Sequence, residues 1–177
     1  MFDEVSGGES FLTLTNCSFY NNQASNDGGA LYNYASLGGT SSPTLTNCSF
    51  HNNQASNSGG ALYNEASSGG TSAPIIKNCI FWQNTGTGKS LFNFNASPQL
   101  TYTLLEESSC PAGASCGTGM IYDQDPQFND PANGDLKLQQ CSPAVDRGLN
   151  SANTETHDLA GNARIVNVSG RTTIDLG

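Results

Sequence analysis

Three cysteines recur at a regular spacing, and their thiols are the first groups of this sequence that could do chemistry. Cys17, Cys48 and Cys79 each follow an asparagine, and the interval between the first two equals the interval between the last two. A metal site needs ligands that converge from different directions, and no histidine shares their position. Neighbouring thiols that point the same way are also poorly placed for a disulfide. We therefore expect a ladder of buried thiols that pack as small apolar groups.

The other three cysteines lie in the second half of the chain. Cys110 and Cys116 flank a short loop, and Cys141 follows at some distance. A local disulfide between Cys110 and Cys116 is expected in an oxidising compartment. Either of these two could pair with Cys141 instead, and the sequence does not choose between the pairings.

Acidic and basic side chains are the groups that would make this chain an enzyme. A glycoside hydrolase needs two facing carboxylates, but Asp27 and Glu65 of the repeats are not in register. A polysaccharide lyase needs a base beside a cationic group, and the repeats offer Lys77 and Lys89. His51 stands alone. We favour a non-catalytic protein and keep a polysaccharide lyase or glycoside hydrolase as the alternative.

A group of aspartates in the second half could supply oxygen ligands to calcium. Its members are Asp123, Asp125, Asp130 and Asp135. Their spacing matches no calcium-binding loop, and aspartates in turns usually bond to the local backbone. No cofactor is therefore expected, with calcium as a weak candidate.

Aromatic side chains recur in two columns, which we expect on the surface. The columns are Tyr20, His51 and Trp82, and Tyr32, Tyr63 and Phe92. Such columns suit stacking against sugar rings or contact with another protein. The alternatives are that the rings only stabilise neighbouring strands, or that a loop covers them.

The elements that position these residues are three copies of one repeat. The segment 13–19 returns as 44–50 and, loosened, as 75–81; Gly-Gly-Ala-Leu-Tyr-Asn occupies 28–33 and 59–64, with a shortened copy at 90–93. Repeats of this length cannot bury a core alone, so they stack into a solenoid. Short apolar alternations between Gly, Asn and Ser clusters predict an all-β protein, a parallel β-helix.

We predict three strands in each coil of this β-helix. The first strand ends at an asparagine, which tolerates the left-handed backbone of a tight bend. The bending positions are Asn16, Asn47 and Asn78, and the inward aromatic positions are Phe19, Phe50 and Phe81. The segments 36–43 and 67–74 should be small-residue loops. By the repeat offset, Met1 should lie opposite Tyr32.

The repeats resemble those of polymorphic outer-membrane proteins and related bacterial surface β-helices. The motifs that carry this resemblance are Phe-x-x-Asn, at 19–22, 50–53 and 81–84, and Gly-Gly-Ala-Leu. The second half resembles the closing segment of secreted bacterial right-handed β-helix proteins, in the segments 125–128, 133–138, 142–148, 158–164 and 173–177. The resemblance implies a secreted or cell-surface protein whose signal and anchor segments are not in this chain.

Composition narrows the possible partners. The formal net charge of −9 and the scattered basic residues argue against nucleic acid. No apolar run is long enough to span a membrane. We expect one domain, with repeat coils in 1–98 and final coils with a capping segment in 99–177. The expected function is adhesion, binding of an extracellular glycan or protein, or end-to-end self-assembly into an oligomer or filament through the uncapped first coil.

Overall fold

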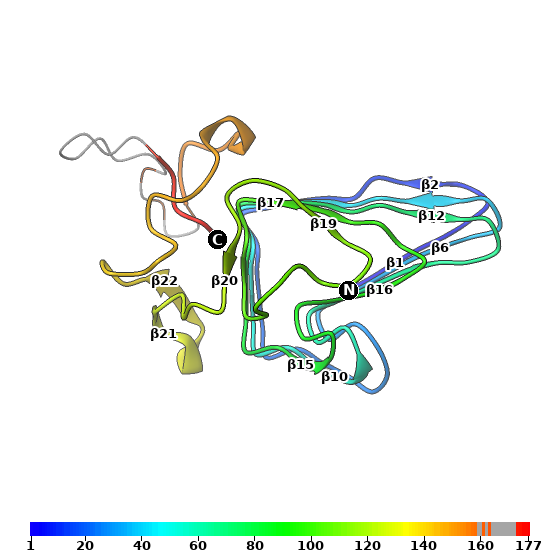
Figure 1. The fold of residues 1–177 in the computed structure, drawn as a ribbon, viewed down its shortest axis with the longest axis horizontal. Helices are drawn as coiled ribbons and strands as arrows, with labels where there is room; N and C mark the ends of the chain where they lie inside the picture. Colours follow the sequence, from blue (N-terminus) through cyan, green and yellow to red (C-terminus); the bar gives the residue numbers. More distant parts are fainter. Residues whose placement is uncertain (159–160, 162, 164–172) are drawn as a thin grey trace.

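The chain forms a parallel β-helix, which confirms the predicted all-β fold (Figure 1). The computed structural model describes residues 1–158, 161, 163 and 173–177. Within this part of the chain, five parallel sheets run along the axis, and each coil contributes one strand to each sheet in the first three coils. We name them sheets A to E.

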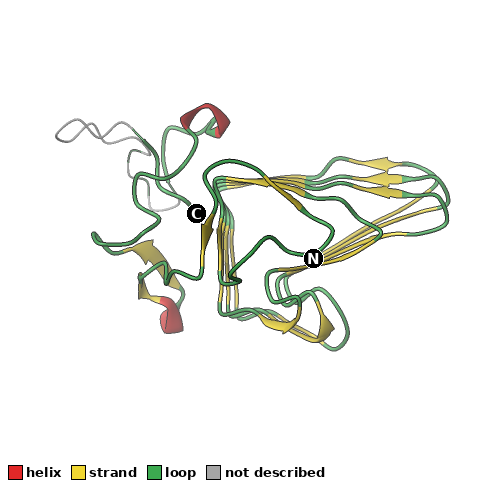
Figure 2. Cartoon of the chain, viewed as in Figure 1, coloured by secondary structure: helices red, strands yellow, loops and turns green. Residues whose placement is uncertain are grey.

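Sheets A and B form the two long sides of a flat extension of the coil (Figure 2). Sheet A contains β1 (Phe2–Ser6), β6 (Leu31–Ser36), β11 (Leu62–Ala66) and β16 (Leu91–Phe94). Sheet B contains β2 (Glu9–Ser10), β7 (Thr40–Ser41) and β12 (Thr71–Ser72).

Sheets C, D and E complete each coil. Sheet C contains β3 (Thr13–Thr15), β8 (Thr44–Thr46), β13 (Ile75–Lys77), β17 (Gln99–Thr101) and β19 (Ser115–Cys116). Sheet D contains β4 (Ser18–Tyr20), β9 (Ser49–His51), β14 (Ile80–Trp82), β18 (Leu104–Leu105) and β20 (Ile121–Tyr122). Sheet E contains β5 (Gln23–Ala24), β10 (Gln54–Ser58) and β15 (Thr85–Thr87).

Asparagines turn the chain from sheet C into sheet D. Asn16, Asn47 and Asn78 all have φ of 53°, the left-handed conformation that asparagine tolerates better than most residues. Their side chains bond along the axis, because Asn78 Nδ2 donates to Asn47 Oδ1 at 3.0 Å and Asn47 Nδ2 to Asn16 Oδ1 at 3.2 Å. The same residue type thus makes the bend and links successive coils.

The core inside the coils is a set of vertical files of like residues. The rings of Phe19 and Phe50 stack at 4.8 Å, and those of Phe50 and Phe81 at 4.6 Å, with interplanar angles of 2° and 1°. Leu31 and Leu62 are fully buried beside them. The predicted repeat offset holds in the first coils of sheets C and D, so like side chains meet from coil to coil.

The prediction of three strands in each coil is wrong, because each repeat coil has five. The segments 36–43 and 67–74, predicted as loops, contain β7 and β12, which pair with each other in parallel. Ser41 and Ser72 of these strands are buried, and Asn33 Nδ2 donates to Ser72 Oγ at 2.8 Å. Small polar residues carry no apolar alternation, so their strand character was not visible in the sequence.

The first coil is one residue shorter than the repeat offset implies. Phe2, and not Met1, lies opposite Tyr32. The extra residue in the second coil is Leu37, which has φ of 50° in the turn after β6. The full repeat offset is restored in β2, where Glu9 lies opposite Thr40.

At the far end of the β-helix, the segment between β18 and β19 covers the third coil. The carboxylate of Glu106 accepts the backbone N–H of Gln83 at 2.8 Å, and that of Glu107 accepts the backbone N–H of Ser90 at 2.7 Å. These N–H groups would otherwise face solvent at the edge of the coil. The stacked strands continue through β20 to Tyr122.

The chain after Tyr122 leaves the coils and packs on the outer face of sheet D (Figure 1). It contains the antiparallel hairpin β21 (Phe128–Asp130), η1 (Pro131–Asn133) and β22 (Asp135–Leu138), followed by η2 (Asn150–Ala152). Phe128, Ala144 and Leu176 of this segment bury Ile80 and Leu104 of sheet D. A second apolar core therefore lies outside the β-helix.

Candidate functional site

The cysteine ladder lies inside the coils, and its thiols are free. Cys48 and Cys79 are buried and Cys17 is half-buried. Burial raises the pKa of the Cys17 thiol and raises that of Cys79 well above its ordinary value. Both therefore stay protonated and weakly nucleophilic at neutral pH. This geometry fits apolar packing, and among the described residues no group of three or more His, Cys, Asp or Glu side chains could hold a metal ion.

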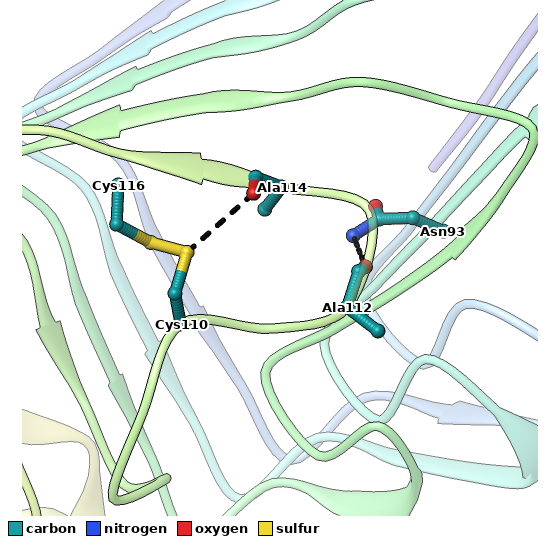
Figure 3. The surroundings of a disulfide bond; sticks show 5 residues. All are labelled: Asn93, Cys110, Ala112, Ala114 and Cys116. Carbon is teal, nitrogen blue, oxygen red and sulfur yellow. Dashed lines mark hydrogen bonds between the residues drawn. A yellow bond between two sulfur atoms is a disulfide. The ribbon is translucent and has the colours of Figure 1, made fainter.

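Cys110 and Cys116 form a disulfide with a Cα–Cα distance of 5.9 Å (Figure 3). Its loop lies against β16, since Asn93 Nδ2 donates to Ala112 O at 2.8 Å. Cys141 is exposed and free. The disulfide thus staples a loop that closes one end of the β-helix.

The four aspartates considered for calcium bond to their own turns or have no converging neighbour. Asp125 Oδ1 accepts the Gln127 backbone N–H at 2.8 Å, and Asp130 Oδ2 accepts Asn133 Nδ2 at 2.8 Å. The hydrogen bond from Asn129 lowers the pKa of Asp135. The fourth, Asp123, has φ of 51° in a turn. These local bonds occupy carboxylate oxygens that a calcium ion would need.

Asp27, Glu65 and Lys89 of the repeat coils each have a partner in the fold. Asp27 Oδ1 accepts the backbone N–H of Ser58 at 2.9 Å, and Glu65 accepts the Tyr32 hydroxyl at 2.8 Å. Lys89 forms an ion pair with Glu106 at 2.9 Å. These contacts give the three side chains a place in the packing of the coils.

The second aromatic column, Tyr32, Tyr63 and Phe92, lies on the outer face of sheet A. Its ring centroids are 4.9 Å and 5.4 Å apart, and Phe2 extends it with a distance of 5.0 Å to Tyr32. The neighbouring outward positions of the four strands hold Glu4, Tyr34, Glu65 and Phe94. Phe2 and Phe94 are 63 % and 48 % exposed. The outer face of sheet A is therefore aromatic and acidic.

The rings of this column lie face to face along the axis. Interplanar angles of 16° and 14° mean that Tyr63 is sandwiched between Tyr32 and Phe92. Sugar rings stack on aromatic faces, and here those faces are occupied by neighbouring rings. The column consequently offers ring edges to a partner, which disfavours the expected stacking of sugars along it.

The first aromatic column is in the predicted register, but it is covered at His51 and only partly open. Tyr20, His51 and Trp82 lie opposite one another on β4, β9 and β14. His51 is only 4 % exposed, and the Phe128 ring meets it edge-on at 5.5 Å. Gly134 lies against the Tyr20 ring so closely that a Cβ there would come within 2.7 Å of it. The segment after Tyr122 covers His51 but leaves Tyr20 44 % exposed, so only part of the column is open to a partner.

The cover leaves a pocket of about 310 Å³ between sheet D and the β21–β22 hairpin. Its lining includes His51, Trp82 and Gln83 from the coils and Asp125, Phe128 and Gln139 from the cover. Burial lowers the pKa of His51, although the Trp82 backbone and the charges of Asp125 and Glu106 act in the opposite direction. The pocket therefore contains a neutral imidazole at pH 7.

The bending asparagines have a second role that the sequence did not reveal. Asn78 exchanges two hydrogen bonds with the backbone of Leu149, Asn47 Nδ2 donates to Asn153 Oδ1 at 2.9 Å, and Asn16 Nδ2 donates to His157 O at 3.2 Å. The C-terminal segment thus runs along the ladder from the third coil to the first. In the sequence, the motif 142–148 indicated that a closing segment is present. It did not indicate that this segment would pack along the asparagine ladder. Another such motif, 158–164, lies largely outside the described residues.

Comparison with known proteins identifies the repeat. The Chlamydia polymorphic membrane protein repeat matches residues 16–34 and 47–65. Each match begins at a bending asparagine and continues into sheet A. No curated protein and no solved structure matches the chain significantly.

The third coil has the same geometry as the two matched ones, although its sequence is looser. Asn78 and Phe81 keep the bend and the ring stack of the first two coils. Among the described residues, no helix has the length and apolar character to span a membrane. The chain is thus a parallel β-helix in which two segments match the Chlamydia polymorphic membrane protein repeat.

Proposed function

We propose that this chain is a non-catalytic, surface-associated β-helix module that adheres to an extracellular protein through the outer face of sheet A. The match to a membrane-protein repeat supports the cell-surface location. The disulfide between Cys110 and Cys116 agrees with an oxidising, extracellular environment.

The single observation that carries the proposal is the composition of this face. Its outward positions include six aromatic side chains and two glutamates, and Ser6 and Ser36 follow them at one end of β1 and β6. The aromatic side chains are Phe2, Tyr32, Tyr34, Tyr63, Phe92 and Phe94, and the glutamates are Glu4 and Glu65. Contiguous apolar surface of this kind marks interaction sites, and aromatic residues are enriched in protein interfaces.

The rigidity of the face favours binding. The Tyr32 hydroxyl donates to Glu65, and the Tyr34 hydroxyl is 3.0 Å from Ser67 Oγ. Rings held by stacking and hydrogen bonds lose little conformational entropy when a partner covers them. A protein partner fits better than a glycan, because the column presents ring edges and not ring faces.

The test is binding of the purified chain to arrays of extracellular proteins and of glycans. Tyr63 lies in the middle of the face, so Tyr63→Ser should weaken binding to a protein partner by tenfold or more. Phe11→Ser is the matched control, because Phe11 is 63 % exposed and lies outside sheet A. Equal binding by the two variants, or binding to glycans alone through this face, would refute the proposal.

Self-assembly is a second candidate, supported by the difference between the two ends of the β-helix. Strands β1 to β5 pair with a described strand on one side only, and a strand with one free side can pair with another chain. At the opposite end, Glu106, Glu107 and the disulfide loop cover the last coils. Association through open edges alone would therefore join two first coils and stop at a pair. Sedimentation that shows only monomers over a wide concentration range would exclude it.

A further inference from the structure

The pocket between sheet D and the hairpin is separate from the face proposed to bind a protein. Two rigid parts form it, since His51 and Trp82 end β9 and β14, while Phe128 and Pro131 belong to the hairpin. Phe128 is buried in the outer core, and Gln139 Nε2 donates to its carbonyl oxygen at 3.1 Å. The volume of about 310 Å³ is at the small end of the range for ligand pockets.

The lining combines a half-buried indole with amide groups. Trp82 packs against the outer core on one side and lines the pocket on the other. The side-chain amides of Gln83 and Gln127 make no hydrogen bond within the part of the chain that the structure describes, although their backbone N–H groups do. Gln83 and Gln127 both have a left-handed backbone, with φ of 55° and 52°. This backbone conformation limits the directions in which their side chains can extend. An aromatic platform beside unpaired amides is what a ring with several hydroxyl groups requires.

His51 adds an unsatisfied polar atom to this lining. The residue is only 4 % exposed, and its Nδ1 has no hydrogen-bond partner among the described residues. Buried polar atoms of native proteins nearly always have a partner in the chain, a water molecule or a ligand. His51 therefore brings a buried ring nitrogen with spare hydrogen-bonding capacity to the residues that line the pocket.

Charge limits the class of ligand. Among the residues that the structure describes, the lining of the pocket has no lysine or arginine, and Asp125 gives it a carboxylate. Phosphate, sulfate and uronic acid groups would be repelled, because nothing there balances their charge. We propose that this pocket binds a neutral sugar, with one ring against Trp82 and its hydroxyl groups bonded to the glutamine amides. This site lies beyond the protein-binding face of sheet A and does not depend on it.

The test uses a reporter that the chain already contains. Trp82 is the only tryptophan of the sequence, so its fluorescence reports directly on the pocket. Lactose, cellobiose, maltose and diacetylchitobiose are titrated into the full chain, with galacturonic acid as the anionic comparison. At least one neutral sugar should give a saturable change, with a dissociation constant of roughly millimolar order, and the acid should give none. Absence of any saturable change, or equal binding of the acid, would overturn the proposal.

Variants locate the binding. Gln83→Ala and Gln127→Ala keep the tryptophan and should each weaken sugar binding roughly 3- to 10-fold. Trp82→Ala should abolish the saturation-transfer signal of the sugar in NMR. Tyr63→Ser on sheet A should leave sugar binding unchanged even where it loses the protein partner. If both glutamine variants bind sugar like the wild type, the pocket is not the site.

Discussion

The environment of a single residue in this molecule is set by the residues at the same position of the coils above and below it. Phe50 has a ring above and a ring below it, and Cys48 is buried in a file of thiols. His51 differs, because its file contains Tyr20 and Trp82 and its ring is covered from outside by Phe128. At this scale, burial decides whether a chemically capable group reacts, titrates or only packs.

His51 should make stability depend on pH in a predictable direction. Burial lowers the pKa of His51 in the folded state, so the unfolded chain binds its proton more readily. Stability should be retained above the unfolded pKa of about 6.5 and decrease as the pH falls through and below it. Asp125 and Glu106 reduce this effect without reversing it.

The measurement is urea denaturation of the wild type and of His51→Phe at pH 7.5, 6.5 and 5.5. Phenylalanine preserves an aromatic contact with Phe128 and removes the titrating group. The wild type should lose more free energy of unfolding than the variant between the first and the last pH. Parallel losses would show that His51 is not responsible.

At the scale of elements, each asparagine of the ladder both turns the chain from sheet C into sheet D and forms hydrogen bonds to neighbouring coils. Asn47 is 1 % exposed, adopts φ of 53° and bonds to Asn16, Asn78 and Asn153. It therefore holds the corner between sheets C and D, joins three coils and anchors the C-terminal segment.

Asn47→Ala should lower the free energy of unfolding by about 3 kcal/mol, from lost hydrogen bonds and from the left-handed backbone that alanine resists. Asn47→Gly should lose about 1 kcal/mol less, because glycine accepts that backbone. The exposed Asn52 has φ of 52° and one ladder bond to Asn21, so Asn52→Ala is the control and should cost less than Asn47→Ala. Chemical denaturation of the three variants measures this, and equal effects of Asn47→Ala and Asn47→Gly would exclude the backbone contribution.

The whole molecule consists of a β-helix and an outer cover that share sheet D. One core lies inside the coils and the other lies between sheet D and the segment after Tyr122. Ile80 and Leu104, both fully buried, face the second core from the sheet. The cover is thus part of the fold, and it also forms one wall of the pocket.

Ending the chain at Asp123 should expose the outer face of sheet D and cause aggregation or binding of an apolar dye. Ile80→Thr together with Leu104→Thr in the shortened chain should restore solubility, because both side chains would then face water. Light scattering and dye fluorescence compare the shortened chain, its double variant and the full chain. A shortened chain that stays monomeric and binds no dye would show that the cover is dispensable.

The sequence by itself determined the architecture, because a coil-to-coil period brings like residues into contact and only a stacked solenoid satisfies it. The bends at Asn16, Asn47 and Asn78 followed from backbone preference, which is a local property. The positions of strands β7 and β12 did not follow from the sequence, since their two-residue Thr-Ser segments carry no apolar alternation and are recognised by their pairing with the neighbouring coil. Whether Trp82 is open or covered was equally undetermined, because it depends on where the described residues after Tyr122 pack. The place where this segment packs is set by long-range contacts with the apolar surface of sheet D and with the asparagine ladder. The pocket forms only because the segment packs there.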